Sequence, residues 1–242
     1  MNSDERYMAA VVSGDLREAY EMVARKASAS GYCLGPVYHG ATHQFYEFDI
    51  SKEHDLGHHF GTIEQAAACA RCASGRGVVS SYFLSVCRPI ELPDLGSWQM
   101  RDVTSEVSFV ANKEIPITAA TIDNPGMDVR LRALDELNEL GFQQDATLCG
   151  QKRFWELLHN LGYDGISYQN TSSLEGGGQS YVVGDASKIK LATAVVYDDA
   201  GGVVPLSKRF LFSHDTRGAA SPLLLSSGKA TVPSLSQRQP VL

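Results

Sequence analysis

The apolar positions of this chain follow a helical period in several stretches. The first stretch begins after Asp15, a residue type that caps helix N-termini well, and Gly31 provides a residue at which the helix can end. Between these two positions one apolar stripe runs along a single face: Leu16, Tyr20, Val23 and Ala27. We therefore predict a helix at the N-terminal end.

A second helix is predicted over residues 63–73, which are rich in alanine. It follows Thr62-Ile63-Glu64-Gln65, a sequence that matches a capping box. In such a box the Thr62 hydroxyl accepts from the Gln65 amide, and the Gln65 side chain reaches back to the backbone of Thr62.

Two more helices are predicted further along the chain. One covers residues 128–140, with Asp128 as its predicted cap and Gly141 as its end. The other covers residues 151–161 and ends at Gly162. Both carry leucines at helical spacing on one face.

Short runs of β-branched and aromatic residues predict strands between these helices. The runs are residues 37–39, 78–86, 165–168 and 180–183, and Tyr181 in the last is expected to pack in the core. Strands and helices are mixed without a regular βαβ rhythm. We therefore predict an α+β fold with a mainly antiparallel sheet.

Sustained periodicity is lost near residue 212. The remaining sequence is rich in Ser, Gly and Pro, and its three leucines at 223–225 are the part that could dock on something. The predicted organisation is an N-terminal helical lead-in (residues 1–34), one folded domain (35–210) and a flexible tail (211–242).

Composition narrows the class of protein. The 242 residues hold 21 Lys plus Arg against 28 Asp plus Glu, a formal charge of −7, which argues against broad binding to nucleic acid. No apolar run approaches the roughly 20 residues that cross a bilayer, and the N-terminus lacks the pattern of a Sec signal. The five cysteines are an odd number, which argues against a disulfide framework. A cytoplasmic globular protein is expected.

Three segments carry the candidate chemistry. The first is Val37-Tyr38-His39-Gly40-Ala41-Thr42, and the second is Leu56-Gly57-His58-His59-Phe60-Gly61-Thr62. The third runs from Gly162-Tyr163-Asp164-Gly165-Ile166 through Glu175 and its three following glycines to Gln179-Ser180-Tyr181-Val182-Val183.

In this order the segments resemble the ADP-ribosyltransferase superfamily of the histidine type. The similarity is greatest to the branch found in polyvalent proteins of phages and mobile elements. It covers most of residues 15–210, including the strand that ends at residues 88–92 and Trp98 after it.

The resemblance implies a role for several residues. His39 would hydrogen-bond a ribose hydroxyl of NAD, and the backbone of Gly40 would hold the nicotinamide carboxamide, a close approach that suits glycine. His59 stands where many relatives stack an aromatic ring on nicotinamide. The implied NAD-binding set is His39, Gly40, Ala41, Thr42, His59, Phe60, Thr62, Gln179 and Ser180.

The expected catalytic acid departs from the usual pattern. In well-known relatives a Glu directly precedes the strand that begins Tyr-Val-Val, and here that position is Ser180. The nearest acid is Glu175, so His39 and Glu175 are the predicted catalytic pair, with Gln179 and Ser180 lining the site. A carboxylate is wanted because cleavage of the bond between nicotinamide and ribose develops positive charge on the sugar.

Other interpretations of these residues stay open. His39 can be a hydrogen-bonded core histidine, and Asp164 can fix the turn between a helix and a strand. A zinc site could use His54, His58 and His59 or the pair Cys69 and Cys72, but the cysteines fall in an alanine-rich helix and Gly57 interrupts the histidines. We predict no metal.

The resemblance therefore implies an NAD-dependent ADP-ribosyltransferase that modifies a protein acceptor and releases nicotinamide. Such an enzyme could serve as a phage factor, or as an effector or toxin delivered into another cell without a Sec signal. The alternative is a module of the same fold that binds NAD or ADP-ribose without transfer.

Overall fold

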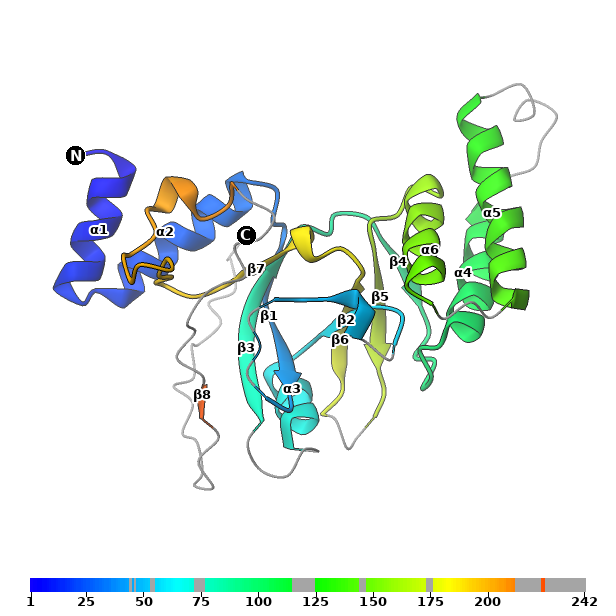
Figure 1. Ribbon diagram of the computed structural model, residues 1–242, viewed down its shortest axis with the longest axis horizontal. Helices are drawn as coiled ribbons and strands as arrows, with labels where there is room; N and C mark the ends of the chain where they lie inside the picture. Colours follow the sequence, from blue (N-terminus) through cyan, green and yellow to red (C-terminus); the bar gives the residue numbers. More distant parts are fainter. Residues whose placement is uncertain are drawn as a thin grey trace, which may run out of the picture.

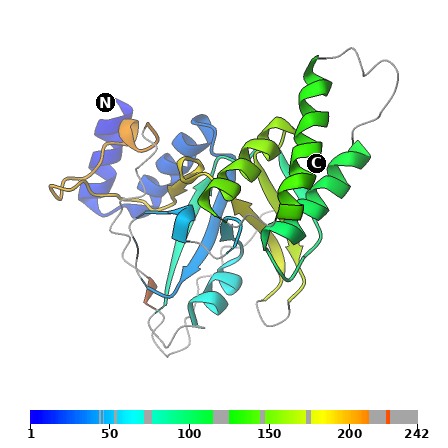
Figure 2. The same cartoon turned by 45° about the vertical axis from the view of Figure 1, so that its right-hand side comes forward.

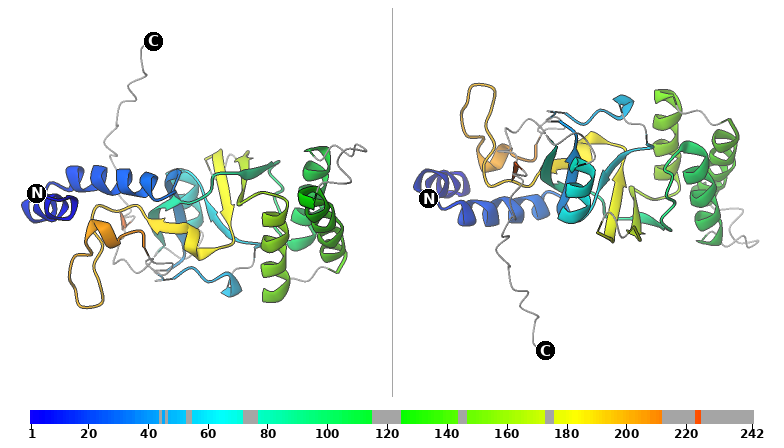
Figure 3. Two further views of the ribbon diagram at one scale, coloured as in Figure 1. Left: turned by 90° about the horizontal axis from the view of Figure 1, so that it is seen from above. Right: turned by 90° about the horizontal axis from the view of Figure 1, so that it is seen from below.

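The elements lie along one long axis in the computed structural model. It describes residues 1–43, 45, 47–52, 55–71, 77–114, 125–143, 147–172, 176–211 and 223–224. Helices α1 and α2 lie at one end, α4, α5 and α6 at the other, and two sheets stand between them (Figures 1 and 2). The views from above and below in Figure 3 show the same order.

Two helices form the N-terminal end, α1 (Ser3–Ser13) and α2 (Leu16–Ala29). The predicted cap of α2 is confirmed, because the Asp15 carboxylate accepts from the amide of Glu18 at 3.0 Å. Helix α1 was not singled out by the sequence. It has its own capping box between Asn2 and Glu5, a pattern that was available to find it.

The helical end is attached to the sheets through Arg209. This arginine is only 3% exposed, and its guanidinium donates to the carbonyls of Leu191 and Thr193 at 3.2 and 2.9 Å. The Tyr7 hydroxyl of α1 donates to the carbonyl of Ala194. These bonds satisfy buried polar groups between α1, strand β7 (Ile189–Leu191) and the short helix η4 (Leu206–Lys208).

The first sheet has the order β1-β3-β7. Strand β3 (Val78–Leu84) lies in the middle and pairs antiparallel with both β1 (Leu34–Ala41) and β7. Strand β8 (Leu223–Leu224) also pairs with β3, at Val78 and Val79, so two of the three leucines of the tail lie against the sheet.

The second sheet has the order β2-β6-β5-β4. Its strands are β2 (His58–Phe60), β6 (Gly178–Val183), β5 (Gly165–Asn170) and β4 (Pro89–Leu92). All pairs are antiparallel except β4 with β5. A bridge between Tyr38 and Gly61 joins the two sheets, with N···O distances of 2.9 Å in both directions.

Helix α3 (Ile63–Arg71) packs on the first sheet through small residues. A Cβ added to Gly40 would stand 1.9 Å from the carbonyl oxygen of Ala66, and one added to Gly77 would stand 2.0 Å from that of Ala70. The alanines four residues apart therefore meet the two glycines at backbone contact. This packing explains why the predicted helix is rich in alanine.

Helices α4 (Met100–Glu114), α5 (Pro125–Gln143) and α6 (Leu148–Asn160) share the largest core cluster with the second sheet. The predicted bounds of α5 were wrong. Asp128 lies within the helix, where it pairs with Arg132, and the helix runs through Gly141. Proline suits the first turn, so the helix begins earlier, and Gly141 packs at the Thr104 side chain instead of ending it.

Helix α4 was not predicted, although its buried positions recur at helical spacing. Two of these positions, Thr104 and Ser108, are polar, which interrupts the apolar stripe. Asp164 lies in the turn between α6 and β5 as predicted, but its carboxylate bonds elsewhere: it accepts from the amides of Cys87 and Arg88 at 2.8 Å each and so ties this turn to the residues before β4.

The prediction of an α+β fold with mainly antiparallel strands is confirmed. Helices α1 and α2 fall within the predicted lead-in, and β1 begins at its boundary. The predicted flexible tail lies outside the described residues apart from 211 and 223–224. None of the described helices is both long and apolar enough to cross a bilayer.

Candidate functional site

A cavity of about 510 Å³ opens where the two sheets meet, and both residues of the bridge that joins them, Tyr38 and Gly61, line it. Its lining includes five residues that the sequence selected for NAD binding from three distant segments: His39, Gly40, His59, Phe60 and Ser180. The pairing of β2 with β6 brings His59 opposite Val182, and the bridge at Tyr38 brings β1 beside them. The sheet topology therefore gathers these five residues.

His39 is held in one orientation. Its Nδ1 lies 2.7 Å from the carbonyl oxygen of His59, and because a carbonyl only accepts, Nδ1 carries the hydrogen. In the neutral ring Nε2 is then an acceptor. The rings of Phe45, Phe48 and Phe60 surround the imidazole at centroid distances of 5.3 to 5.6 Å. This surrounding fixes a polar ring at the cavity wall.

His59 belongs to an aromatic group at the same cavity. Its ring meets Trp98 edge-on at 5.3 Å, and Nδ1 lies 3.2 Å from the Tyr168 hydroxyl. The ring centroids of Trp98 and Tyr168 are 4.3 Å apart. The Nε2 of His59 lies 3.8 Å from an oxygen of Asp55. The cavity thus offers aromatic surface for a planar ligand group.

Ser180 is fixed by the helix cap that the sequence predicted. The Thr62 amide donates to Gln65 Oε1 at 2.6 Å, and the Gln65 amide lies 3.3 Å from Thr62 Oγ1, so the capping box is confirmed. Gln65 Oε1 also accepts from the Ser180 hydroxyl at 3.2 Å, and its Nε2 donates to the Gly178 carbonyl. One buried amide therefore ties α3 to β6.

The other predicted site residues lie outside the lining of the cavity. Ala41 ends β1, and the Thr42 hydroxyl lies 2.9 Å from the Nδ1 of His43. Thr62 serves as the cap of α3, and the exposed Gln179 donates to the carbonyl of Tyr168 at 3.2 Å. Glu175 lies outside the described residues.

Asp94 is a cavity residue that the sequence analysis missed. Its Oδ2 accepts from the backbone amide and the hydroxyl of Thr171 at 2.9 and 3.1 Å, and its Oδ1 accepts from the amide of Gly96 at 3.3 Å. The bond from the Thr171 amide, assisted by the other two, lowers the pKa of Asp94 below its ordinary value. The carboxylate is therefore ionised at neutral pH.

The parallel pairing of β4 with β5 explains where Asp94 lies. Carboxyl ends of parallel strands meet at one edge of a sheet, so Asp94 beyond β4 reaches Thr171 beyond β5. A polar residue just past each of two strands was a visible signal. The sequence did not show that these two strands pair in parallel.

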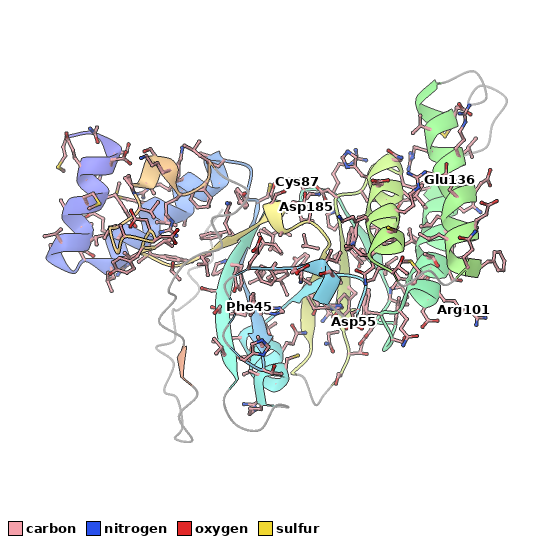
Figure 4. All side chains as sticks on the ribbon, in the orientation of Figure 1. Phe45, Asp55, Cys87, Arg101, Glu136 and Asp185 are labelled. Atoms are coloured by element: carbon pink, nitrogen blue, oxygen red, sulfur yellow. The ribbon has the colours of Figure 1, made fainter. Side chains whose placement is uncertain are left out.

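The charge of the cavity is one-sided. Among the described residues that line it are Asp55 and Asp94, and none is a lysine or an arginine. Figure 4 shows Asp55 and Phe45 at the level of β1, β2 and β6, away from Cys87 and Asp185 near the other end of the strands. The lining alone offers no cationic side chain to a phosphate group.

The alternative of a zinc site gains no support from the described part of the chain. His54 and Cys72 lie outside it, and the remaining His, Cys, Asp and Glu residues form no group of three or more that could hold a metal ion. Cys69 is exposed and lines the cavity.

No protein-family model, no curated protein and no solved structure matches this chain.

Proposed function

We propose that this chain is an NAD-dependent ADP-ribosyltransferase with an ADP-ribosyltransferase-like fold, acting on a protein side chain and releasing nicotinamide. The observation that carries the proposal is the gathering of His39, Gly40, His59, Phe60 and Ser180 around one cavity. The family pattern selected these residues without any knowledge of which strands pair. Their convergence supports that pattern.

Different parts of the proposed site would face the nicotinamide ring and the diphosphate of NAD. Aromatic rings at His59, Trp98 and Tyr168 suit the flat, positively charged nicotinamide ring. The described lining offers no lysine or arginine to the diphosphate, so the proposal requires that backbone amides hold it.

Each predicted residue then has a chemical task. His39, oriented by its bond to the His59 carbonyl, holds a ribose hydroxyl. Glu175 stabilises the positive charge that develops on the ribose as its bond to nicotinamide breaks. The electron pair of that bond leaves with nicotinamide, and the acceptor atom forms the new bond to the same carbon while losing a proton to water.

The test is release of nicotinamide from NAD by the purified chain and by two variants, His39→Ala and Glu175→Ala. We expect loss of the Glu175 carboxylate to lower turnover by roughly 10²–10³, and loss of His39 to lower it as well. His159→Ala and Glu139→Ala are matched controls at exposed positions of α6 and α5. Turnover unaffected by both site variants would sink the assignment.

A second candidate is a module that binds NAD or ADP-ribose without transfer. Ser180 favours it, because this residue stands where the family pattern has a glutamate. Ser180 is only 3% exposed, and its hydroxyl donates to Gln65 Oε1. A neutral hydroxyl cannot supply the charge that the reaction needs. Saturable binding of NAD with no nicotinamide release would establish this candidate.

A further inference from the structure

Two cysteines lie in contact at one end of the first sheet, away from the cavity. Cys33 directly precedes β1, and Cys87 lies in the connection from β3 to β4. Leu34 pairs with Leu84 in the antiparallel ladder, and the cysteines follow one residue before Leu34 and three residues after Leu84. Continuing this register places them at diagonal positions, within reach of each other. A side-chain hydrogen bond joins the two thiols, and Figure 4 shows Cys87 well away from Asp55 of the cavity.

Hydrogen bonds to other parts of the chain fix both cysteines. The Cys33 thiol donates to the carbonyl oxygen of Gly31 at 3.3 Å. The Cys87 amide donates to the Asp164 carboxylate at 2.8 Å. A disulfide forms readily only where the side chains of its cysteines already converge. This arrangement keeps the two side chains together and so meets that requirement.

Both thiols are exposed, so a small molecule in solution can reach them. The hydrogen bond to Cys33, assisted by desolvation and by the charges of Cys33 and Asp164, raises the pKa of Cys87 to about 11, and Lys188 opposes this rise only in part. Cys87 is therefore a protonated thiol at neutral pH. Because the thiolate is the nucleophile in disulfide chemistry, the first attack of the pair falls to Cys33.

Reaction of Cys33 then activates Cys87. A Cys33 sulfur that is bound in a mixed disulfide carries no charge and is a weak acceptor, so the largest cause of the raised pKa of Cys87 is removed. The Cys87 thiol then loses its proton more readily and can attack the adjacent Cys33 sulfur. The contact between the two thiols therefore sets the order of attack.

We propose that Cys33 and Cys87 form a thiol–disulfide exchange site, at which a small disulfide in solution converts the pair into one intramolecular disulfide. With oxidised glutathione, the Cys33 thiolate attacks one glutathione sulfur, and the other glutathione leaves as a thiolate. The Cys87 thiolate then attacks Cys33, and the second glutathione leaves. The two cysteines lose two electrons and two protons, and one glutathione disulfide becomes two thiols. A reversible pair agrees with the odd number of cysteines, which argues only against a disulfide framework.

The disulfide would close a loop that contains β1, β2, α3 and β3. Cross-linking a long loop stabilises a chain mainly by restricting its unfolded state. For a chain of this size we expect oxidation to raise Tm by roughly 4–16 °C, and reduction by dithiothreitol to reverse the rise. The pair stands outside the proposed NAD site, so its oxidation and the release of nicotinamide are tested independently.

The test is incubation of the full chain with oxidised glutathione, followed by tryptic mapping of the monomer without reduction. The tryptic peptides 27–52 and 77–101 each contain one cysteine, Cys33 and Cys87 respectively. We expect these two peptides to appear as one linked species. Glutathione adducts at both positions without a link, or a link from either cysteine to a different one, would overturn the inference.

Three serine variants locate the reaction. Cys87→Ser should stop at a mixed disulfide of Cys33 with glutathione, and neither this variant nor Cys33→Ser should gain Tm on oxidation. Cys149→Ser, at an exposed position of α6, should form the link and gain Tm as the wild type does. A linked wild-type chain whose Tm does not rise contradicts the inference as well, because the contact in the folded chain would then not fit the disulfide.

Discussion

Replacing Gly40 by alanine tests how closely α3 packs on β1. The new Cβ would stand 1.9 Å from the carbonyl oxygen of Ala66 and 2.7 Å from its carbonyl carbon. Real Cβ atoms do not approach other atoms closer than 3.0 Å, so the helix must move by about 1 Å or the strand must bend. The obstacle is backbone, which cannot swing aside as a side chain does.

The magnitude follows from this displacement. Overpacking a closely packed contact costs typically about 1–3 kcal/mol. For a chain of 150–250 residues each kcal/mol lowers Tm by roughly 2–4 °C, so Gly40→Ala should lower Tm by about 2–12 °C. Moving α3 also displaces Gln65, which holds Ser180 at the cavity, so ligand binding should weaken together with stability.

Thermal unfolding followed by circular dichroism measures the effect. Gly202→Ala is the matched control, because the nearest atom to its new Cβ is a side-chain oxygen of Asp198 at 3.1 Å. This variant should change stability by less than about 0.5 kcal/mol. A Gly40→Ala protein with the Tm of the wild type would refute the close packing of α3 on β1.

Two further predictions concern the same cavity. Gln65→Met keeps the size of the side chain but removes its bonds to Thr62, Gly178 and Ser180, so urea unfolding should show a loss of about 1–3 kcal/mol; an unchanged midpoint would contradict this. The pKa of Asp94 is lowered in the folded chain, mainly by the Thr171 amide, so its contribution to stability is present above its unfolded value of 3.8 and is lost as pH falls through the lower folded value. The difference in Tm between wild type and Asp94→Asn should therefore narrow between pH 6 and pH 3, and a constant difference would speak against it.

Local signals in the sequence predicted most elements of the fold. Caps at Asp15 and Thr62 marked the starts of α2 and α3, because capping needs only residues within one turn. Helix α4 was missed since Thr104 and Ser108 interrupt its apolar stripe. The Thr104 hydroxyl bonds back to the carbonyl of Met100 at 2.7 Å, which lets a polar residue be buried there.

Only part of the candidate site could be predicted, and the reason differs from the reason that α4 was missed. His39, Gly40 and His59 belong to motifs that can be recognised along the chain, whereas Asp94 acquires its role only through the parallel pairing of β4 with β5. Strand pairing is a long-range property, and a one-residue shift changes which side chains meet. Motifs along the chain therefore could not identify residues such as Asp94, whose place at the cavity depends on which strands pair.

The charge of the cavity links these observations. The chain carries a net charge of −7, and two of its acidic residues, Asp55 and Asp94, line the cavity, whose described lining contains no lysine or arginine. Such a site repels phosphate groups and attracts cations, so it would place the positively charged nicotinamide inside and the diphosphate at the rim. Added salt screens carboxylates that are open to solvent, so the attraction of this cavity for the nicotinamide ring should weaken as the ionic strength rises.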